Sequence, residues 1–194
     1  MNEVLLSFLL GLIQGLTEFL PISSSAHLLF PALLFGTDDL GLAFDIAVHA
    51  GTLVAVLYFF RSEIKLMIKS LISRNNNFND NRKLAYLLII ATIPIVIAGL
   101  LGTDFIESNR NSIASIAYMN LLFAGFLLFS YKYSASSKSL IELTIAGAIF
   151  IGIFQVFALF PGASRSGTAI TAALLIGLNL SLIHISEPTR RTPI

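Results

Sequence analysis

Four stretches of this sequence are each apolar and long enough to cross a lipid bilayer as a helix. A bilayer core about 30 Å thick needs roughly 20 apolar residues for each crossing helix. The stretches cover residues 41–60, 84–103, 113–131 and 140–160. Soluble domains have about 25% charged residues, whereas this chain has 12% and a mean hydropathy of +0.85. The sequence therefore predicts an all-α fold, a polytopic membrane helical bundle.

Three further apolar runs are too short to cross on their own. Residues 4–20 stop at Pro21, and the runs 28–35 and 167–179 lie beside Pro, Ser and Gly residues. Such runs indicate broken or re-entrant helices, which are tolerated at membrane depth where they are buried in protein or line a wet cavity. The first run does not resemble a cleaved signal peptide, because no Lys or Arg precedes it.

The basic residues predict an orientation. Six of the twelve Lys and Arg residues lie in the connection 61–83, which the positive-inside rule places in the cytoplasm. The connections 36–40 and 104–112 are acidic and are expected outside, and the connection at 132–139 is expected inside again.

Composition also excludes several classes of function. The chain has no Cys, which rules out a disulfide scaffold, a thiolate metal site and a cysteine nucleophile. Its formal net charge is only +1, so we expect no nucleic-acid partner.

A repeat links two distant parts of the chain. GLIQGLTEFLPISSSAH, residues 11–27, aligns with GIFQVFALFPGASRSGT, residues 152–168. Both are an apolar helix that ends at a proline and a small, hydroxyl-rich loop. Three predicted crossings separate the copies, so re-entrant copies would enter the bilayer from opposite sides, and inverted repeats of broken helices indicate a binding site near the midplane. The alternative is a chance likeness between two Gly/Pro kinks.

Ionisable residues inside the spans are candidates for function, because each costs roughly 2.5–3.5 kcal/mol on insertion. Glu18 and Arg165 are the two that we place in the site. Gln14 shares a helical face with Glu18. A third residue, Asp45, lies four positions before His49; this pair either extends an acid–base network, binds a cation or only locks helices together, and we do not predict it to be catalytic.

The two loops carry complementary chemistry. The first has Ser24 close to His27, and a serine becomes a nucleophile when a base takes its proton; the alternative is a serine-rich helix cap. The second surrounds Arg165 with Ser and Gly before an apolar helix, which offers backbone N–H groups, a helix N-terminus and a guanidinium to an anion such as phosphate. The alternative is a buried ion pair of Arg165 with Glu18 that only fixes packing.

QGLTEFLPISSSAH and PGASRSGT together resemble the two signature regions of the bacterial undecaprenyl-diphosphatase family, membrane phosphatases also known for bacitracin resistance. The resemblance extends to about Asn179. It implies hydrolysis of undecaprenyl diphosphate to undecaprenyl phosphate and phosphate, which recycles the lipid carrier for peptidoglycan synthesis. It also implies a multi-pass protein of the bacterial plasma membrane whose active site faces the outer side.

The resemblance and the residues together suggest roles. Arg165 holds the diphosphate, Ser24 is the candidate nucleophile and His27 its base and later acid. Glu18 orients His27 or helps to hold a divalent cation, Mg2+ or Ca2+, and no organic cofactor is expected. Attack through histidine or through water stays open. Further residues expected to bind substrate are Gln14, Ser23, Ser25, Gly162, Ser164, Ser166, Gly167 and Thr168. Gln14 replaces a Glu found in some family members, which puts a two-carboxylate metal site in doubt.

The last fifteen residues, LSLIHISEPTRRTPI, differ abruptly from the rest. They resemble the translation of a sequencing adapter joined to a truncated gene, and the family normally continues with further membrane helices. We therefore expect an incomplete membrane domain over residues 1–179 and a non-native tail over 180–194, the alternative being a natural polar tail. The tail's ionisable residues, His184, Glu187, Arg190 and Arg191, are excluded from the predicted site.

Two alternatives to a phosphatase stay open at this point. The first is a polyprenyl-phosphate flippase or transporter, because inverted repeats of broken helices also occur in transporters. The second is that the 194-residue chain is inactive on its own. The expected partners are the polyprenyl diphosphate and membrane lipids, and the sequence leaves a homodimer open.

Overall fold

The structure is a computed structural model that describes residues 3–37, 39–73, 79–109, 112–135 and 137–179. The predicted adapter-derived tail, with His184, Glu187, Arg190 and Arg191, lies outside the described residues. The domain boundary at Asn179 therefore stays a prediction.

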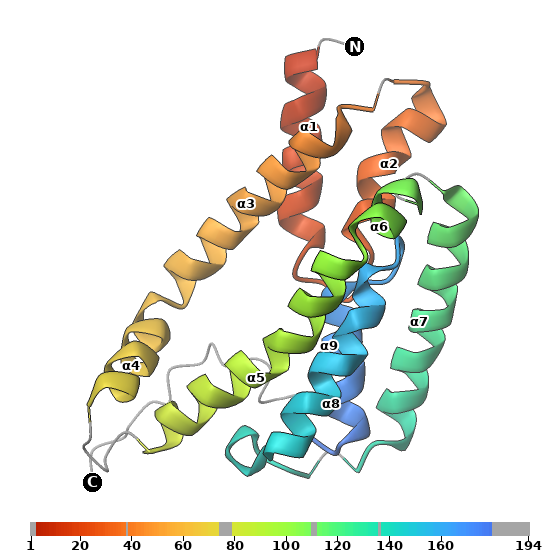
Figure 1. Cartoon of the computed structure of the whole chain (residues 1–194). Coiled ribbons are helices and arrows are strands. Elements are labelled where there is room, and N and C mark those ends of the chain that lie inside the picture. The colour runs from red at the N-terminus through yellow and green to blue at the C-terminus, as the bar shows by residue number, and fades with distance from the viewer. Residues whose placement is uncertain (1–2, 38, 74–78, 110–111, 136, 180–194) are drawn as a thin grey trace, which may run out of the picture.

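Helices account for almost all of the regular structure in the described residues (Figure 1). In chain order they are α1 (Glu3–Thr17), α2 (Ser24–Phe35), α3 (Gly41–Phe59), α4 (Arg61–Ile72), α5 (Asn79–Leu101), α6 (Thr103–Asn109), α7 (Ile113–Tyr133), η2 (Leu140–Glu142), α8 (Ile145–Val156), η3 (Phe157–Leu159) and α9 (Arg165–Leu175). The all-α prediction is confirmed.

Three helices of the described chain, α3, α5 and α7, are long and apolar enough to cross a membrane. They correspond to three of the four predicted crossings. The prediction of one continuous helix over 140–160 is wrong, because the chain breaks between η2 and α8. Ser139 and Glu142 form a capping box around η2, and the Thr144 side chain then accepts a hydrogen bond from the Gly147 N–H at the start of α8. Each cap satisfies backbone groups locally and so separates the two elements.

The shorter helices form two hairpins whose tips meet in the middle of the molecule. The hairpin α1–α2 enters from one end and the hairpin α8–α9 from the other (Figure 1). The Ser166 hydroxyl of the second tip donates a hydrogen bond of 2.6 Å to the Leu20 carbonyl of the first. This arrangement agrees with the opposed entry that the sequence repeat predicts.

The hairpin α8–α9 packs tightly on α5 and α7. Gly152 of α8 lies so close to α5 that a Cβ atom there would be 2.4 Å from the Ala91 carbonyl oxygen. Small residues that let helix backbones approach are typical of helix packing in membranes. The buried cluster of Leu87, Leu143, Ala148, Ala173 and Leu178 lies among the same helices.

The outside of the bundle is strongly apolar. Phe35 is 76% exposed, Leu101 85% and Tyr118 75%, and many other large apolar side chains are more than half exposed. Such a surface suits lipid rather than water, because large apolar patches on a soluble monomer are rare. Together with the three long apolar helices, it makes this a membrane protein.

Candidate active site

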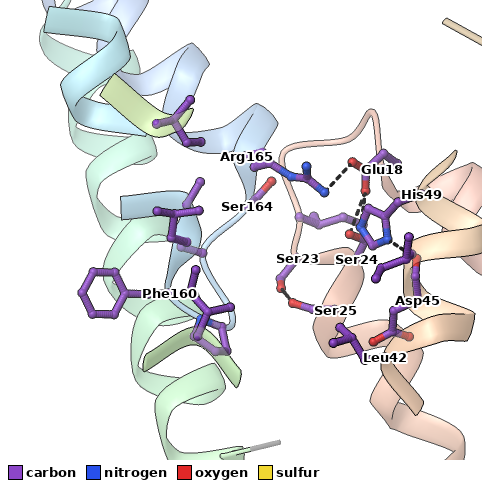
Figure 2. A pocket seen from close by; sticks show the side chains of 18 of the residues that line it. Glu18, Ser23, Ser24, Ser25, Leu42, Asp45, His49, Phe160, Ser164 and Arg165 are labelled. Atoms are coloured by element: carbon purple, nitrogen blue, oxygen red, sulfur yellow. Dashed lines mark hydrogen bonds and ion pairs between the residues drawn. The ribbon is translucent and has the colours of Figure 1, made fainter. Parts of the chain in front are cut away.

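A cavity of about 530 Å³ lies where the two hairpin tips meet α3 (Figure 2). Its polar lining residues are Glu18, Ser23, Ser24, Ser25, Asp45, His49, Ser164 and Arg165. The three ionisable residues that the sequence placed inside the spans thus share one cavity. They come from segments far apart in the chain, and the cavity therefore depends on the complete fold of the described helices.

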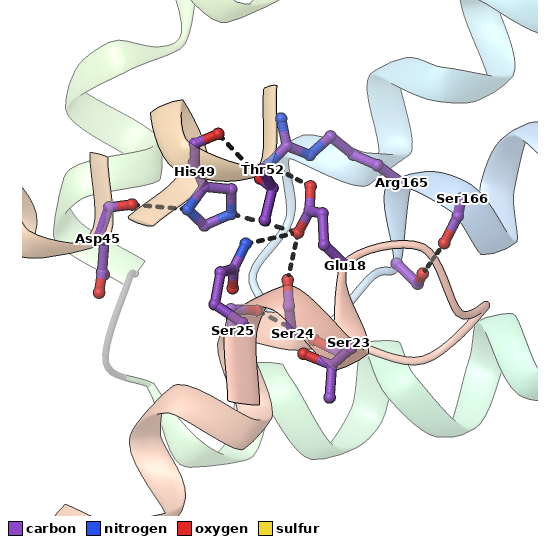
Figure 3. A network of polar contacts seen from close by, with 12 residues as sticks. Glu18, Ser23, Ser24, Ser25, Asp45, His49, Thr52, Arg165 and Ser166 are labelled. Atoms are coloured by element: carbon purple, nitrogen blue, oxygen red, sulfur yellow. Dashed lines mark hydrogen bonds and ion pairs between the residues drawn. The ribbon is translucent and has the colours of Figure 1, made fainter. Parts of the chain in front are cut away.

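The Glu18 carboxylate is the centre of a polar network (Figure 3). Its Oε2 atom accepts hydrogen bonds from Gln14 Nε2 at 2.8 Å and from the Ser24 hydroxyl at 2.9 Å. His49 Nε2 lies 3.5 Å from the same oxygen, and Arg165 Nη2 lies 3.3 Å from Oε1. The contacts come from α1, α2, α3 and α9. Because donors surround both oxygens, the negative charge is compensated inside the protein.

The serine cluster separates into a structural and a reactive part. Ser23 is 1% exposed and caps α2, since its side chain accepts from the Ala26 N–H, and its hydroxyl also lies 2.9 Å from that of Ser25. Ser24 instead directs its hydroxyl toward the Glu18 carboxylate. The helix-cap alternative therefore applies to Ser23, whereas Ser24 has the hydroxyl–carboxylate contact that an activated nucleophile needs.

The imidazole beside this network is that of His49 rather than His27. His27 Nδ1 lies 2.6 Å from the Ser23 carbonyl, one helical turn back, and the ring stacks near Phe30. His27 does not line the cavity. In the described residues no contact joins it to Ser24 or Glu18, so its predicted role as base stays a prediction without geometric support.

The second loop repeats the construction of the first. The Ser164 side chain caps α9 by accepting from the Gly167 N–H at 3.1 Å, and its hydroxyl lies 3.0 Å from that of Ser166. The Thr168 hydroxyl donates to the Arg165 carbonyl at 2.9 Å. Gly162 has φ of +97°, a conformation that side-chain-bearing residues rarely adopt. These contacts fix the start of α9, with Arg165 as its first residue.

The predicted site residues thus divide into two sets. Those that line the cavity are Glu18, Ser23, Ser24, Ser25, Ser164 and Arg165, and those that do not are Gln14, His27, Gly162, Ser166, Gly167 and Thr168. Gln14 still contacts Glu18, and most of the others shape the loops. The prediction that the second set binds substrate directly is not tested by this geometry.

Arg165 is paired with Glu18 and accessible at the same time. Its side chain is 56% exposed, against 17% for Glu18. The pair is therefore only partly buried, unlike the buried pair that the packing alternative expects. The guanidinium is therefore available to an anion that enters the cavity.

Glu18 is the residue that the sequence suggests as a ligand of a divalent cation. No group of three or more His, Cys, Asp or Glu side chains is close enough to hold a metal ion among the described residues. Hydrogen-bond donors surround Glu18, and beside it the buried Gln14 Oε1 atom has no hydrogen-bond partner in the described residues. The predicted divalent cation therefore stays a prediction.

The chain is similar to known proteins over most of its length. A family model described as "Bacitracin resistance protein BacA" matches residues 7–182. An undecaprenyl-diphosphatase of Alcanivorax borkumensis is 50% identical over 173 residues, which cover 88% of this chain and 65% of the relative. One of Saccharophagus degradans is 46% identical over 180 residues, covering 92% of this chain and 68% of that relative. The chain thus spans about two thirds of the length of these curated relatives, and it belongs to the BacA bacitracin resistance family.

Proposed function

We propose that this chain carries the catalytic site of an undecaprenyl-diphosphatase, which hydrolyses undecaprenyl diphosphate to undecaprenyl phosphate and phosphate. The relatives' names support the reaction. The observation that carries the proposal is the Ser24 hydroxyl, 2.9 Å from the Glu18 carboxylate, with Arg165 on the other carboxylate oxygen. A nucleophile, a proton acceptor and a cation for phosphate are thereby within one cavity.

The geometry supports attack by serine. Ser24 Oγ attacks the terminal phosphorus, its proton passes to Glu18 Oε2, and the bond to the bridging oxygen breaks, so undecaprenyl phosphate leaves. Glu18 passes this proton to the departing undecaprenyl phosphate and is a carboxylate again. Water then attacks the phosphoserine: its hydroxide joins the phosphorus, its other proton goes to Ser24 Oγ as the O–P bond breaks, and phosphate leaves. The distance favours Glu18 over His27 as the proton acceptor, since His27 makes no contact with Ser24.

Arg165 changes partner in this scheme. In the structure its guanidinium pairs with Glu18, and an incoming phosphate offers it a partner with more charge and more acceptor oxygens. Phosphoryl transfer depends mainly on positioning and on electrostatic stabilisation of the equatorial oxygens. Substrate binding therefore draws Arg165 to the phosphate and leaves the Glu18 carboxylate to Ser24.

The cavity walls suit a lipid substrate. Next to the polar residues lie Leu42, Ile46, Val96, Ile106 and Leu159. An apolar wall beside a phosphate site accommodates a polyprenyl chain whose head group reaches Ser24. The proposed substrate is therefore a lipid diphosphate within the membrane rather than a soluble one.

The proposed setting is the bacterial plasma membrane, with the site open to the outer side. Support comes from the basic residues, because α4 and the connection from α7 to α8 lie at one end of the bundle and α6 at the other (Figure 1). The positive-inside rule assigns the first end to the cytoplasm. In this setting the enzyme would recycle the lipid carrier for peptidoglycan synthesis and contribute to bacitracin resistance. A homodimer stays open.

A divalent cation remains part of the proposal as a ligand of the diphosphate. Mg2+ is commonly held by one or two carboxylates together with substrate phosphates, so it does not need a group of three acidic or His ligands, which is absent among the described residues. Phosphate release measured with and without a chelator, followed by added Mg2+ or Ca2+, tests it. An unchanged rate in chelator would contradict the cation requirement.

The central test is phosphate release from undecaprenyl diphosphate in detergent or liposomes. The 194-residue chain is assayed beside the full-length Alcanivorax borkumensis relative, which also tests whether the chain is active on its own. Ser24→Ala and Arg165→Ala are each expected to lose about 100-fold or more in kcat, as when one transition-state donor is removed. Ser108→Ala and Arg61→Ala, outside the cavity, are the matched controls. A wild-type rate of phosphate release in Arg165→Ala would contradict the assignment of the site.

A flippase function has no comparable support. Transport alone requires neither a nucleophile nor a carboxylate to take its proton, whereas the cavity has both. Transfer of labelled undecaprenyl phosphate across liposomes by Ser24→Ala, without phosphate release, would be the result in favour of transport.

A further inference from the structure

We infer that His49, which lies outside both sequence motifs, is a positioning residue that holds the Glu18 carboxylate in place for Ser24. The inference rests on the proposed function, because it concerns the group that takes the Ser24 proton. His49 belongs to α3, a helix between the two motifs in the chain, and it reaches the same carboxylate oxygen as Ser24 (Figure 3).

The His49 ring is fixed from its far side. Its Nδ1 atom lies 2.7 Å from the Asp45 carbonyl, which can only accept, so Nδ1 is the donor there. The Nε2 atom faces Glu18 at 3.5 Å and donates to it in the imidazolium form, in which both ring nitrogens carry a proton. The Thr52 hydroxyl in turn donates to the His49 carbonyl at 2.8 Å. The imidazole is thus oriented by the backbone of α3, and its position does not depend on substrate.

Glu18 needs such a partner because of where it lies. It follows the last residue of α1, in the turn before Pro21, so its side chain is not held between helical turns on both sides. In the proposed reaction Arg165 moves to the phosphate and Ser24 gives up its proton. Of the contacts in the structure, those from Gln14 and His49 then remain on Glu18.

Gln14 and His49 approach Oε2 from different elements. Gln14 lies one turn back on the same helix as Glu18, whereas His49 crosses from α3. A contact within α1 moves with α1, but a contact from α3 fixes the carboxylate relative to the cavity. Placement to within a fraction of an ångström matters for the rate, since a misplacement of about 1 Å can cost 100-fold.

The alternative is that His49 only locks α3 to α1. Substitution of His49 by glutamine distinguishes the positioning role from the packing role, because the glutamine side-chain amide can place an N–H near the position of His Nε2. A positioning role predicts that His49→Gln keeps kcat within about threefold, while His49→Ala loses about tenfold or more in kcat with KM changed less than twofold. A packing role predicts that kcat follows thermal stability in both variants.

The experiment measures kcat and KM for phosphate release from undecaprenyl diphosphate by the 194-residue chain in liposomes, together with the thermal midpoint of each variant. Val54→Ala is the control, since this residue is on α3 and is 66% exposed. Wild-type kcat in His49→Ala, or equal losses in His49→Gln and His49→Ala, would overturn the inference.

A second measurement does not require activity. The infrared carboxylate band of Glu18 is isolated as the difference between wild type and Glu18→Gln. It is expected to shift in His49→Ala and to return in His49→Gln, and an unshifted band would overturn the inference. If the chain releases no phosphate while the Alcanivorax borkumensis relative does, the proposed function of the chain fails, and the band alone decides on His49.

Discussion

A single residue, Glu18, explains how this protein keeps charge inside an apolar bundle. Insertion of one carboxylate costs roughly 2.5–3.5 kcal/mol, and such a group persists where donors compensate it. Four side chains contact the Glu18 carboxylate, and each comes from a different helix. The network is therefore both a stabilising feature and the proposed reaction centre.

Glu18→Gln tests the charge of this residue while keeping its size. We expect kcat for phosphate release to fall about 100-fold or more, because an amide does not take the Ser24 proton. The KM should stay equal or decrease, since Arg165 is released for the phosphate. Glu63→Gln on α4 is the control. A variant with wild-type kcat would show that another group accepts the proton.

At this scale the sequence predicted the charged residues, placed Gln14 on the face of Glu18 and gave the Arg165–Glu18 ion pair as an alternative, but it did not predict the contact with His49. Glu18 and Arg165 are visible because they interrupt apolar runs, and their motifs point to phosphate. His49 sits in a long apolar run as well, but its contact with Glu18 requires that α3 pack against the tip of α1. No local pattern encodes that packing. Likewise, the short sequence distance between Ser24 and His27 suggested a contact, and α2 turns the His27 side chain toward its own backbone instead.

At the scale of elements, the two loops use one design twice. A capping serine, a second hydroxyl two residues later and a helix N-terminus recur at α2 and at α9. The second loop adds Gly162, whose backbone conformation and close neighbours allow no side chain. The loop geometry therefore depends on glycine at this position.

Gly162→Ala should destabilise the protein by about 1–3 kcal/mol through backbone strain. In addition, the new Cβ atom would lie 2.3 Å from the Ile116 carbonyl oxygen. We expect a lower thermal midpoint in detergent and reduced phosphate release. Gly125→Ala, in the middle of α7 with no atom within 4 Å of its Cβ, should keep or raise the midpoint. Equal midpoints for Gly162→Ala and wild type would contradict the expectation.

The capping box before α8 predicts a pH effect. The Ser139 backbone N–H donates to the Glu142 carboxylate at 2.6 Å, which lowers the pKa of Glu142 below its usual value of 4.5. A lowered folded-state pKa means that the stabilisation is present above pH 4.5 and is lost as the pH falls through the folded-state pKa. The thermal midpoint of Glu142→Gln should therefore lie below that of wild type at pH 7, with the difference shrinking in acid. A difference independent of pH would exclude this cause.

The same capping box explains why the prediction of one continuous helix over residues 140–160 is wrong. Hydropathy alone joins residues 140–160 into one helix, because Leu, Ile and Phe dominate on both sides of the break. The break is set by side-chain caps at Ser139 and Thr144. Caps use residues that also occur in membrane helices, so hydropathy could not locate them.

At the scale of the whole molecule, the helices form two groups. The first contains α1, α2 and α3, and the second contains α5, α7, α8 and α9, with α4 leading from one to the other (Figure 1). The cavity lies between the groups and takes residues from both. The inverted repeat predicted this arrangement in outline, since it placed two similar hairpins on opposite sides.

Membrane orientation is testable because the chain has no Cys. Lys65→Cys on α4 and Ser108→Cys on α6 lie at opposite ends of the bundle. In intact cells a membrane-impermeant maleimide should label Ser108→Cys and leave Lys65→Cys unlabelled until the membrane is opened. The reverse pattern would invert the proposed orientation. Wild type, which lacks a thiol, is the blank.

The contact between the hairpin tips has a mechanical consequence. The Arg165–Glu18 ion pair and the Ser166–Leu20 hydrogen bond tie the two helix groups together at the cavity. In the proposed reaction, a diphosphate that takes Arg165 while lying against Ser24 replaces one tie with another. The interactions of Arg165 would then serve both the packing of the two helix groups and catalysis. In each catalytic cycle Arg165 would exchange the Glu18 carboxylate for the phosphate and then return to it. The two helix groups would therefore stay joined throughout the cycle.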